Sequence, residues 1–185
     1  MMRELADNIM DIAQNSISAG AALTQVHVKI SHGEDLITIT FRDDGCGMDE
    51  ELVKSVTEPF TTTRKTRKVG LGLPLLKMTA QATGGDFSIE SEVGKGTSVR
   101  VSFGLDHIDR PPMGDLPGSL FTIVLMNPGT EFLFVYDCDG KNFTFDTREV
   151  KAAVAPIPID HPEISAWIKD CLYQEITELH GGLLL

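Results

Sequence analysis

The chain of 185 residues has a mass of 20.2 kDa, which suits one domain or one domain with a small extension. It carries 16 basic and 27 acidic side chains, and this net charge of −11 argues against a nucleic-acid-binding protein, which needs clustered positive charge. The sequence contains no apolar run of membrane-spanning length, and its polar, acidic N-terminus lacks the pattern of a signal peptide. We therefore expect a cytoplasmic protein without a membrane span.

Cysteine and proline placement refine this expectation. Cys46, Cys138 and Cys171 are widely spaced, with neither a CxxC metal motif nor a disulfide framework, as expected in a reducing compartment. Three prolines and two glycines in residues 107–118 disfavour both helix and strand. The predicted organisation is a domain over 1–105, a linker over 106–117 and a C-terminal extension over 118–185.

The first half of the chain predicts a mixture of helices and strands. Apolar spacing and turn residues predict a helix over 3–18, strands over 25–30 and 36–42, a short helix over 49–56, a helix over 71–83, and a hairpin with strands over 87–91 and 98–103. This order predicts an α/β two-layer sandwich: a mixed sheet with its helices on one face.

The extension is predicted to contain a small sheet and a helix. The expected strands are 120–126, 131–136 and 142–145, and a helix follows to about Leu179, with Asp160 as its cap and Glu163 closing a capping box. Aromatic residues alternate in these strands, and so few strands must pack on something else. We expect the extension either to cover its own domain, by packing on the final helix or on an open sheet edge, or to bind a partner or a second copy.

A polar stripe lies beside the apolar face of the first helix. Glu4, Asn8, Asp11 and Asn15 recur at helical spacing. Amide and carboxylate oxygens one turn apart suit a hard cation such as Mg²⁺, although a solvated helix face would show the same pattern.

Three glycine-containing segments follow. Asp43-Asp-Gly45-Cys-Gly47 ends a strand, where a carboxylate can accept a hydrogen bond from an exocyclic amine and the glycines let the backbone bend around a flat ring. Residues 58–74 combine hydroxyls, four basic residues and a GxG that opens a helix, which favours phosphate binding. The turn Gly94-Lys-Gly96-Thr97 closes the hairpin. Taken singly, the first and last of these segments would be ordinary turns.

These four segments, in this order and spacing, resemble the conserved boxes of the GHKL ATP-binding superfamily, which includes gyrase-type topoisomerases, a large heat-shock chaperone, histidine kinases and mismatch-repair ATPases. The resemblance covers residues 4–103, and residues 58–74 are most similar to sensor histidine kinases. It implies the Bergerat fold and ATP and Mg²⁺ as cofactors.

The resemblance also implies residue roles. Asn15 would coordinate Mg²⁺, with Asp11 polarising water or acting on the metal through water. Asp43 would bind the adenine amine, Gly45 and Gly47 would shape the adenine pocket, and Thr97 would join its water network. The remaining implied nucleotide contacts are Gly70, Leu71, Gly72 and Leu73 at a helix start, and Arg64, Lys65, Arg67 and Lys68 in a lid over Thr61–Val69 that is mobile without nucleotide.

Three departures from the family pattern affect the expected activity. Asp11 stands where ATP-hydrolysing members carry a glutamate, which tilts the expectation towards kinase-like use. Lys68 replaces a glycine of the lid, and the strand that precedes the first helix in histidine kinases is missing, so the C-terminal strands are candidates to replace it.

The sequence leaves three functions to compare. The first is an ATPase or kinase that transfers phosphate in trans to a partner protein in bacterial signalling. A histidine kinase needs a phosphoacceptor helix pair, usually just before the ATP domain, and none is predicted there. His161, whose context faintly resembles a phosphoacceptor, fits better in the first turn of a capped helix. The second is a nucleotide-gated binding module, similar to anti-sigma-factor kinases. A mismatch-repair-like clamp is disfavoured, since the chain is short and acidic. The partner is a phosphoacceptor or a regulator, and a homodimer is a further expectation.

Overall fold

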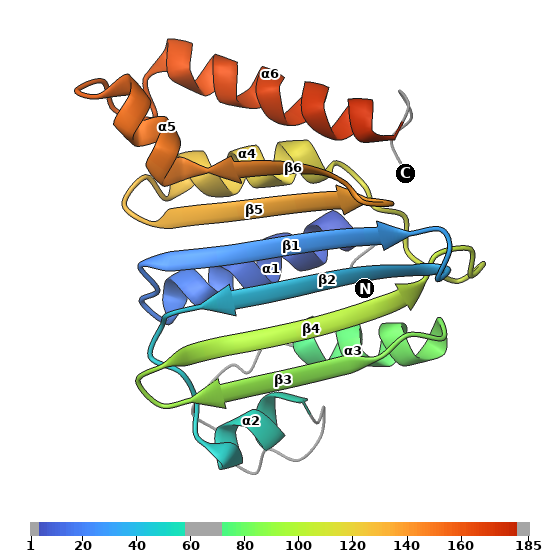
Figure 1. Cartoon of the computed structure of the whole chain (residues 1–185). Helices are drawn as coiled ribbons and strands as arrows, with labels where there is room; N and C mark the ends of the chain where they lie inside the picture. The colour runs from blue at the N-terminus through green and yellow to red at the C-terminus, as the bar shows by residue number, and fades with distance from the viewer. Residues whose placement is uncertain (1–3, 58–71, 181–185) are drawn as a thin grey trace.

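The computed structural model describes residues 4–57 and 72–180, and these form a six-stranded sheet with most of its helices packed on one face, whereas the short helix at residues 147–154 lies on the other side of the sheet (Figure 1). The strand order is β3-β4-β2-β1-β5-β6, in which β1 and β5 are parallel and every other neighbouring pair is antiparallel. This is the mixed sheet of a Bergerat-type α/β sandwich that the sequence predicts.

Most elements of the first half are confirmed to within a few residues. They are α1 (Leu5–Ser18), β1 (Leu23–Ser31), β2 (Leu36–Asp43), α2 (Glu50–Thr57), α3 (Gly72–Ala82), β3 (Phe87–Glu92) and β4 (Gly96–Gly104). The helix α2 starts as predicted, since the Asp49 carboxylate accepts a hydrogen bond from the Leu52 amide at 2.8 Å.

The second half contains α4 (Leu116–Met126), β5 (Glu131–Cys138), β6 (Lys141–Asp146), α5 (Thr147–Val154) and α6 (Pro162–Leu179). The strand predicted over 120–126 is wrong, because this segment is helical. Asp115 caps α4 by accepting from the Gly118 amide, and Pro117 fits the first turn, where no amide hydrogen is needed. Residues 120–126 are almost continuously apolar, so their pattern did not distinguish a buried strand from a helix.

Two predictions about the final helices are also corrected. The helix α5 was missed, although the Asp146 carboxylate caps it by accepting from the Arg148 amide at 2.9 Å. The helix α6 begins after His161, which makes no side-chain capping bond, so the predicted Asp160 cap and Glu163 capping box are absent in this described segment. The buried residues of α6 are Ser165, Ile168, Leu172 and Ile176, whereas Trp167 is 53% exposed.

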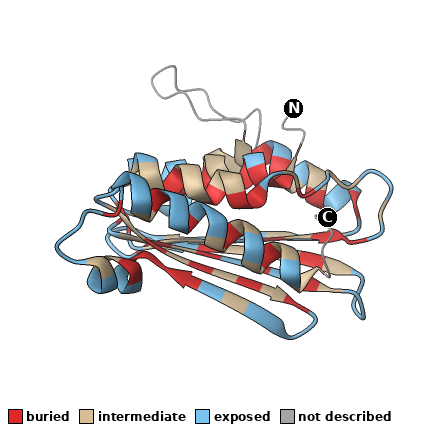
Figure 2. Cartoon of the chain, turned by 90° about the horizontal axis from the view of Figure 1, so that it is seen from above, coloured by how far each residue is buried: buried red, intermediate tan, exposed pale blue. Residues whose placement is uncertain are grey.

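The core lies between the sheet and the helical layer, as Figure 2 shows. Alternate residues of β1 and β5, such as Val28 and Tyr136, point into this core and lie opposite each other in the parallel register. The helices α4 and α6 contact each other, α4 contacts α1, and α6 contacts β6. The hairpin β5–β6 therefore occupies the edge of β1 and lies beneath α6, so the extension covers its own domain as one of the two predicted arrangements.

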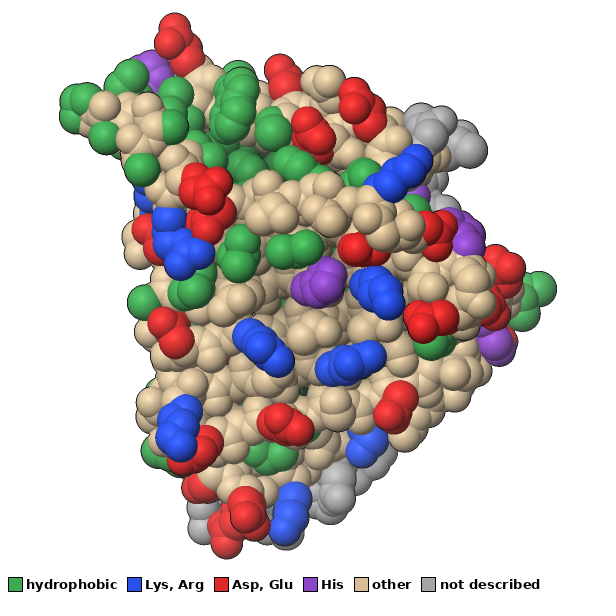
Figure 3. All heavy atoms as spheres, viewed as in Figure 1, with side chains coloured by type: hydrophobic (Ala, Val, Ile, Leu, Met, Phe, Trp, Pro, Cys, Tyr) green, Lys and Arg blue, Asp and Glu red, His purple; other side chains and the backbone are tan. Residues whose placement is uncertain are grey.

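The opposite face of the sheet carries polar and basic side chains. His27, Lys29, Arg42 and Arg100 are exposed on β1, β2 and β4, where alternation directs them away from the core. Figure 3 views this face and shows Lys and Arg side chains over the middle strands, with acidic side chains around them.

Candidate nucleotide-binding site

A cavity of about 460 Å³ opens at the end of the sheet where β2 ends and β4 begins. Its volume lies within the range of pockets that hold small-molecule ligands, about 300–1,000 Å³. The cavity is lined partly by apolar side chains and partly by polar side chains from α1 and the strand ends. The lining residues are Asp11, Ile12, Asn15, Ser16, Ser18, Ala19, Phe41, Asp43, Cys46, Gly47, Met48, Leu52, Val56, Gly72, Leu73, Ile89, Thr97 and Val99.

The Asp43 carboxylate is fixed at the base of this cavity. Its Oδ1 accepts a hydrogen bond from the Gly45 amide at 3.0 Å, and its Oδ2 accepts one from the Ser16 hydroxyl at 2.9 Å. Each oxygen keeps a second acceptor position, and an ionised carboxylate has no hydrogen to donate. The site therefore selects a ligand that donates a hydrogen bond, such as the amine of adenine.

Thr97 lies beside Asp43, because the two are register partners on β4 and β2. The Thr97 hydroxyl is 2.9 Å from the Ser91 hydroxyl, which donates to the Gly96 carbonyl and accepts from the Met48 amide. This network connects the hairpin of β3 and β4 to the loop after β2. The pairing of β2 with β4 places Asp43 and Thr97 side by side in the cavity, as the resemblance implies.

At two positions near the cavity, Gly47 and Gly96, another backbone segment lies so close that only glycine fits. A Cβ on Gly47 would lie 2.0 Å from the Glu92 carbonyl oxygen, and one on Gly96 would lie 1.9 Å from the Asp43 carbonyl oxygen. Both residues also have positive φ, at 65° and 100°. Gly45 is absent from the lining residues and acts instead through its amide on Asp43.

The polar end of the cavity is formed by α1 and the start of α3. Asp11 and Asn15 line it, and a Cβ on Gly72 would lie 2.1 Å from Asp11 Oδ2, so the Asp11 carboxylate touches the first turn of α3. The other two members of the predicted stripe point elsewhere: the buried Asn8 donates to the Glu4 carbonyl, and Glu4 lies against Gly114. The stripe thus contributes two residues to the site.

The donor set at this end fits the chemistry of Mg²⁺. A carboxylate and an amide oxygen one turn apart supply the hard oxygen ligands that Mg²⁺ prefers, with water completing its shell. The cavity is also large enough for a nucleotide base and sugar. The predicted contacts Arg64, Lys65, Arg67, Lys68, Gly70 and Leu71, and the whole predicted lid, lie outside the described residues.

Burial makes Asp11 sensitive to pH, because desolvation raises the pKa of its carboxyl group. A folded pKa above the unfolded one means that the folded state binds more protons, so the stability from this group falls as pH rises through that range. We expect Asp11→Asn to raise the melting temperature at pH 7 by about 1–2 °C, roughly 0.5 kcal/mol after solvent screening. At a pH of about 2.5, where the carboxyl is protonated in both states, the shift should vanish.

The exposed Asp7 on the same helix provides the matched control. Asp7→Asn removes an equal charge from the first turn and should give no rise in melting temperature at pH 7. Equal melting temperatures for wild type and Asp11→Asn at pH 7 would contradict the burial argument.

Sequence reasoning missed two polar residues that position the site. Ser16 is buried on α1, and its hydroxyl donates a hydrogen bond to Asp43. Ser91 was counted only as a strand residue, and it links Met48, Gly96 and Thr97. The Ser16–Asp43 and Ser91–Met48 contacts depend on tertiary packing between segments 27 and 43 residues apart, which no local pattern encodes.

No helix in the described ranges 4–57 and 72–180 is long and apolar enough to cross a membrane.

Comparison with known proteins places the site in a family. Residues 1–107 match the family described as histidine kinase-, DNA gyrase B-, and HSP90-like ATPase. The chain is 32% identical over 109 residues to a putative sensor protein of Shewanella frigidimarina and 31% identical over 103 residues to the sensor histidine kinase AruS of Pseudomonas aeruginosa. It is 33% identical over 100 residues to sporulation kinase E of Bacillus subtilis.

These matches involve part of each protein. They cover 58%, 52% and 54% of this chain, and 17%, 10% and 13% of the three relatives. A solved N-terminal domain of a DNA repair protein has a similar fold, with a TM-score of 0.52 and 17% identity over 77% of this chain and 52% of that chain. The match over residues 1–107, more than half of the chain, shows that this protein belongs to the family of histidine kinase-, DNA gyrase B-, and HSP90-like ATPases.

Proposed function

We propose that the chain binds ATP with Mg²⁺ in this cavity and transfers the terminal phosphoryl group to a partner protein in a signalling process. The observation that carries the proposal is the Asp43 carboxylate, held by Ser16 and Gly45 beside Thr97, with Asp11 and Asn15 at the other end of the same cavity. One end suits an adenine amine and the other suits a metal-bound phosphate.

Each residue has a distinct part in this proposal. Asp43 accepts the hydrogen bond of the adenine amine, and the apolar wall, which includes Ile89 and Val99, packs against the ring. Asn15 holds Mg²⁺, which neutralises phosphate charge when it is bound. Asp11, whose carboxylate lies against the first turn of α3, would polarise water or contact the ion through water.

The family relatives named as kinases support phosphoryl transfer as the type of reaction. Asp11 stands where ATP-hydrolysing members of the family carry a glutamate that acts as general base for water. A kinase needs no such base, so the aspartate favours phosphoryl transfer to a partner protein over ATP hydrolysis. Cys46, Cys138 and Cys171 are free thiols, which supports a reducing cytoplasm as the setting.

Calorimetry of the full chain with ATP and GTP, each with Mg²⁺, tests the proposed ligand. Guanine carries a carbonyl where adenine carries its amine, so it would place an acceptor against the Asp43 carboxylate. We expect ATP to bind with a Kd between micromolar and sub-millimolar, about −5 to −8 kcal/mol, and GTP to bind at least about tenfold more weakly. Equal affinities for the two nucleotides would refute adenine recognition by Asp43.

Transfer of labelled phosphate to a protein separates the proposed reaction from the alternative of a nucleotide-gated binding module. The purified chain is incubated with γ-labelled ATP and Mg²⁺, with and without a bacterial protein extract from which endogenous ATP has been removed. Label transferred to a protein only when the chain is present supports phosphoryl transfer in trans. ATP that stays bound and intact in both samples supports the binding module.

A further inference from the structure

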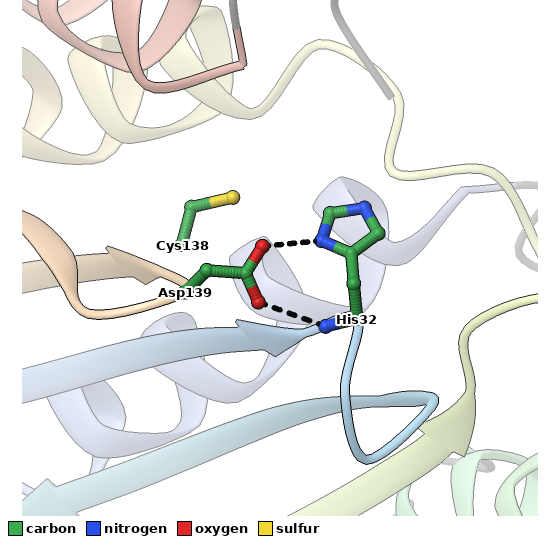
Figure 4. Close-up of side chains that lie close together, drawn as sticks. All are labelled: His32, Cys138 and Asp139. Carbon is green, nitrogen blue, oxygen red and sulfur yellow. Dashed lines mark hydrogen bonds and ion pairs between the residues drawn. The ribbon is translucent and has the colours of Figure 1, made fainter.

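A cluster of potential metal ligands lies at the end of the sheet opposite Asp43. His32 follows β1, Cys138 is the last residue of β5, and Asp139 begins the turn to β6. Figure 4 shows the three side chains converging from these two segments, which are more than a hundred residues apart in sequence. One ligand atom from each residue lies within 4.8 Å of the other two.

His32 and Asp139 already hold each other in place. The Oδ2 of Asp139 is 2.7 Å from His32 Nδ1, and its Oδ1 accepts from the His32 backbone amide at 2.9 Å. Asp139 adopts a positive φ of 50°, which turns its carboxylate back towards β1. The imidazole and the carboxylate are therefore positioned by the backbone, in the way that a binding site requires.

A fourth potential ligand comes from the end of α6. The Nδ1 of His180 is 3.9 Å from Cys138 Sγ, and its Nε2 is hydrogen-bonded to the Tyr136 hydroxyl. The Tyr136 ring packs on the edge of the imidazole, with ring centroids 5.3 Å apart. If Nε2 carries the hydrogen and donates it to Tyr136, the lone pair of Nδ1 points at the sulfur. Histidines that bind metals are commonly oriented through their second nitrogen in this manner.

From this geometry we infer that His32, Cys138, Asp139 and His180 form a binding site for Zn²⁺. Zn²⁺ binds thiolate, imidazole and carboxylate ligands, whereas Mg²⁺ and Ca²⁺ bind oxygen ligands and have little affinity for a thiolate. In a tetrahedral zinc site the ligand atoms lie about 3.3–3.7 Å apart, from Zn–N distances of about 2.0–2.1 Å and a Zn–S distance of about 2.3 Å. The ligand atoms of His32, Cys138 and Asp139 lie within 4.8 Å of one another, and His180 Nδ1 lies 3.9 Å from Cys138 Sγ, so these side chains must move closer together to hold one ion.

Binding requires one proton to leave the cluster. The Cys138 thiol releases its proton to solvent and bonds to Zn²⁺ as a thiolate. The hydrogen that His32 Nδ1 shares with Asp139 moves to His32 Nε2, so that both imidazoles bind as neutral ligands and Asp139 binds as a carboxylate. The charges of the thiolate and the carboxylate together balance the two charges of the ion. Among the described residues, His32, Cys138 and Asp139 are the one group of three or more His, Cys, Asp or Glu side chains close enough for a metal, and His180 approaches this group through Cys138.

The site would join the two halves of the chain. His32 belongs to the family-matched residues 1–107, whereas the other three ligands belong to the extension. Ile30 and Cys138 are register partners of the parallel pair β1 and β5, so the ion would tie the end of that pair to the end of α6. Zn²⁺ that binds only the folded chain stabilises it by mass action and holds the extension on the ATPase domain.

The test is a zinc titration of the full chain after chelator treatment, without nucleotide, with Co²⁺ as a spectroscopic probe. We expect one Zn²⁺ per chain, a higher melting temperature, and for Co²⁺ a thiolate charge-transfer band with the intense visible bands of tetrahedral coordination. Loss of an outer-shell partner alone typically costs about 10–100-fold in metal affinity. Cys138→Ser and His32→Gln remove ligands and are therefore each expected to weaken binding by at least about 100-fold and to abolish the charge-transfer band or the tetrahedral spectrum.

Cys171→Ser is the matched control, since this half-buried thiol on α6 is outside the cluster and should leave zinc binding unchanged. Thermal unfolding in the absence of zinc reports folding in every variant, independently of nucleotide binding. Zinc affinity of the wild type no higher than that of Cys138→Ser would overturn the site and leave the His32–Asp139 pair as a simple turn contact. Unchanged affinity in His180→Gln would overturn the fourth ligand.

Discussion

Replacing Asp43 with asparagine is expected to lower ATP affinity by roughly 10–100-fold, the equivalent of one hydrogen bond to a charged group. The asparagine side chain would present an amide NH₂ group, which donates hydrogen bonds, where the adenine amine needs an acceptor. The Ser16 hydroxyl and the Gly45 amide would lose their charged partner as well. Calorimetry with ATP and Mg²⁺ measures the loss.

The control for this experiment is Asp109→Asn. Asp109 is an exposed carboxylate in the loop after β4, absent from the cavity lining, so its replacement removes the same charge without touching the site. Thermal unfolding of both variants checks that the fold is intact. If a folded Asp43→Asn variant binds ATP as tightly as wild type, adenine recognition by this carboxylate is wrong.

Replacing Asn15 with alanine is expected to remove the dependence of ATP binding on Mg²⁺. Asn15 is exposed on α1 and lines the polar end of the cavity, so its loss removes an oxygen ligand without opening the core. ATP affinity in Mg²⁺ should fall by roughly tenfold or more, to the value measured with a chelator. A Mg²⁺ titration at constant ATP gives this comparison directly.

Gln14→Ala is the matched control for Asn15→Ala, because Gln14 is the exposed neighbour on the same helix and does not line the cavity. It should retain the full Mg²⁺ effect. An unchanged metal titration for Asn15→Ala would mean that another group holds the ion.

The fold of residues 1–107 could be predicted because its elements carry local information. Apolar alternation marked β1, β2 and the β3–β4 hairpin, and helical spacing marked α1 and α3. Asp43 and Thr97 could be predicted as neighbours only through the resemblance, since their pairing depends on β2 lying beside β4. The orientation of Asp43 could not be predicted, because Ser16 reaches it from another element.

The extension was harder to predict for a physical reason. Residues 120–126 are almost continuously apolar, a composition that fits a buried strand as well as a helix, although the buried residues of α4 lie on one helical face. The parallel pairing of β5 with β1 joins segments about a hundred residues apart, which no turn motif between them specifies. The aromatic alternation of β5 did predict which of its residues are buried, namely Phe132, Phe134 and Tyr136.

The cavity between α1, α3 and the ends of β2 and β4 is the proposed place of ATP and Mg²⁺, on which the whole functional proposal depends. An amide NMR titration of the full chain with a non-hydrolysable ATP analogue and Mg²⁺ tests this placement residue by residue. We expect saturable shifts at Asn15, Gly45, Gly47 and Thr97, with the amides of β6 and α6 unchanged. A saturating nucleotide that leaves these four amides unchanged, or that shifts only the exposed sheet face, would contradict the placement.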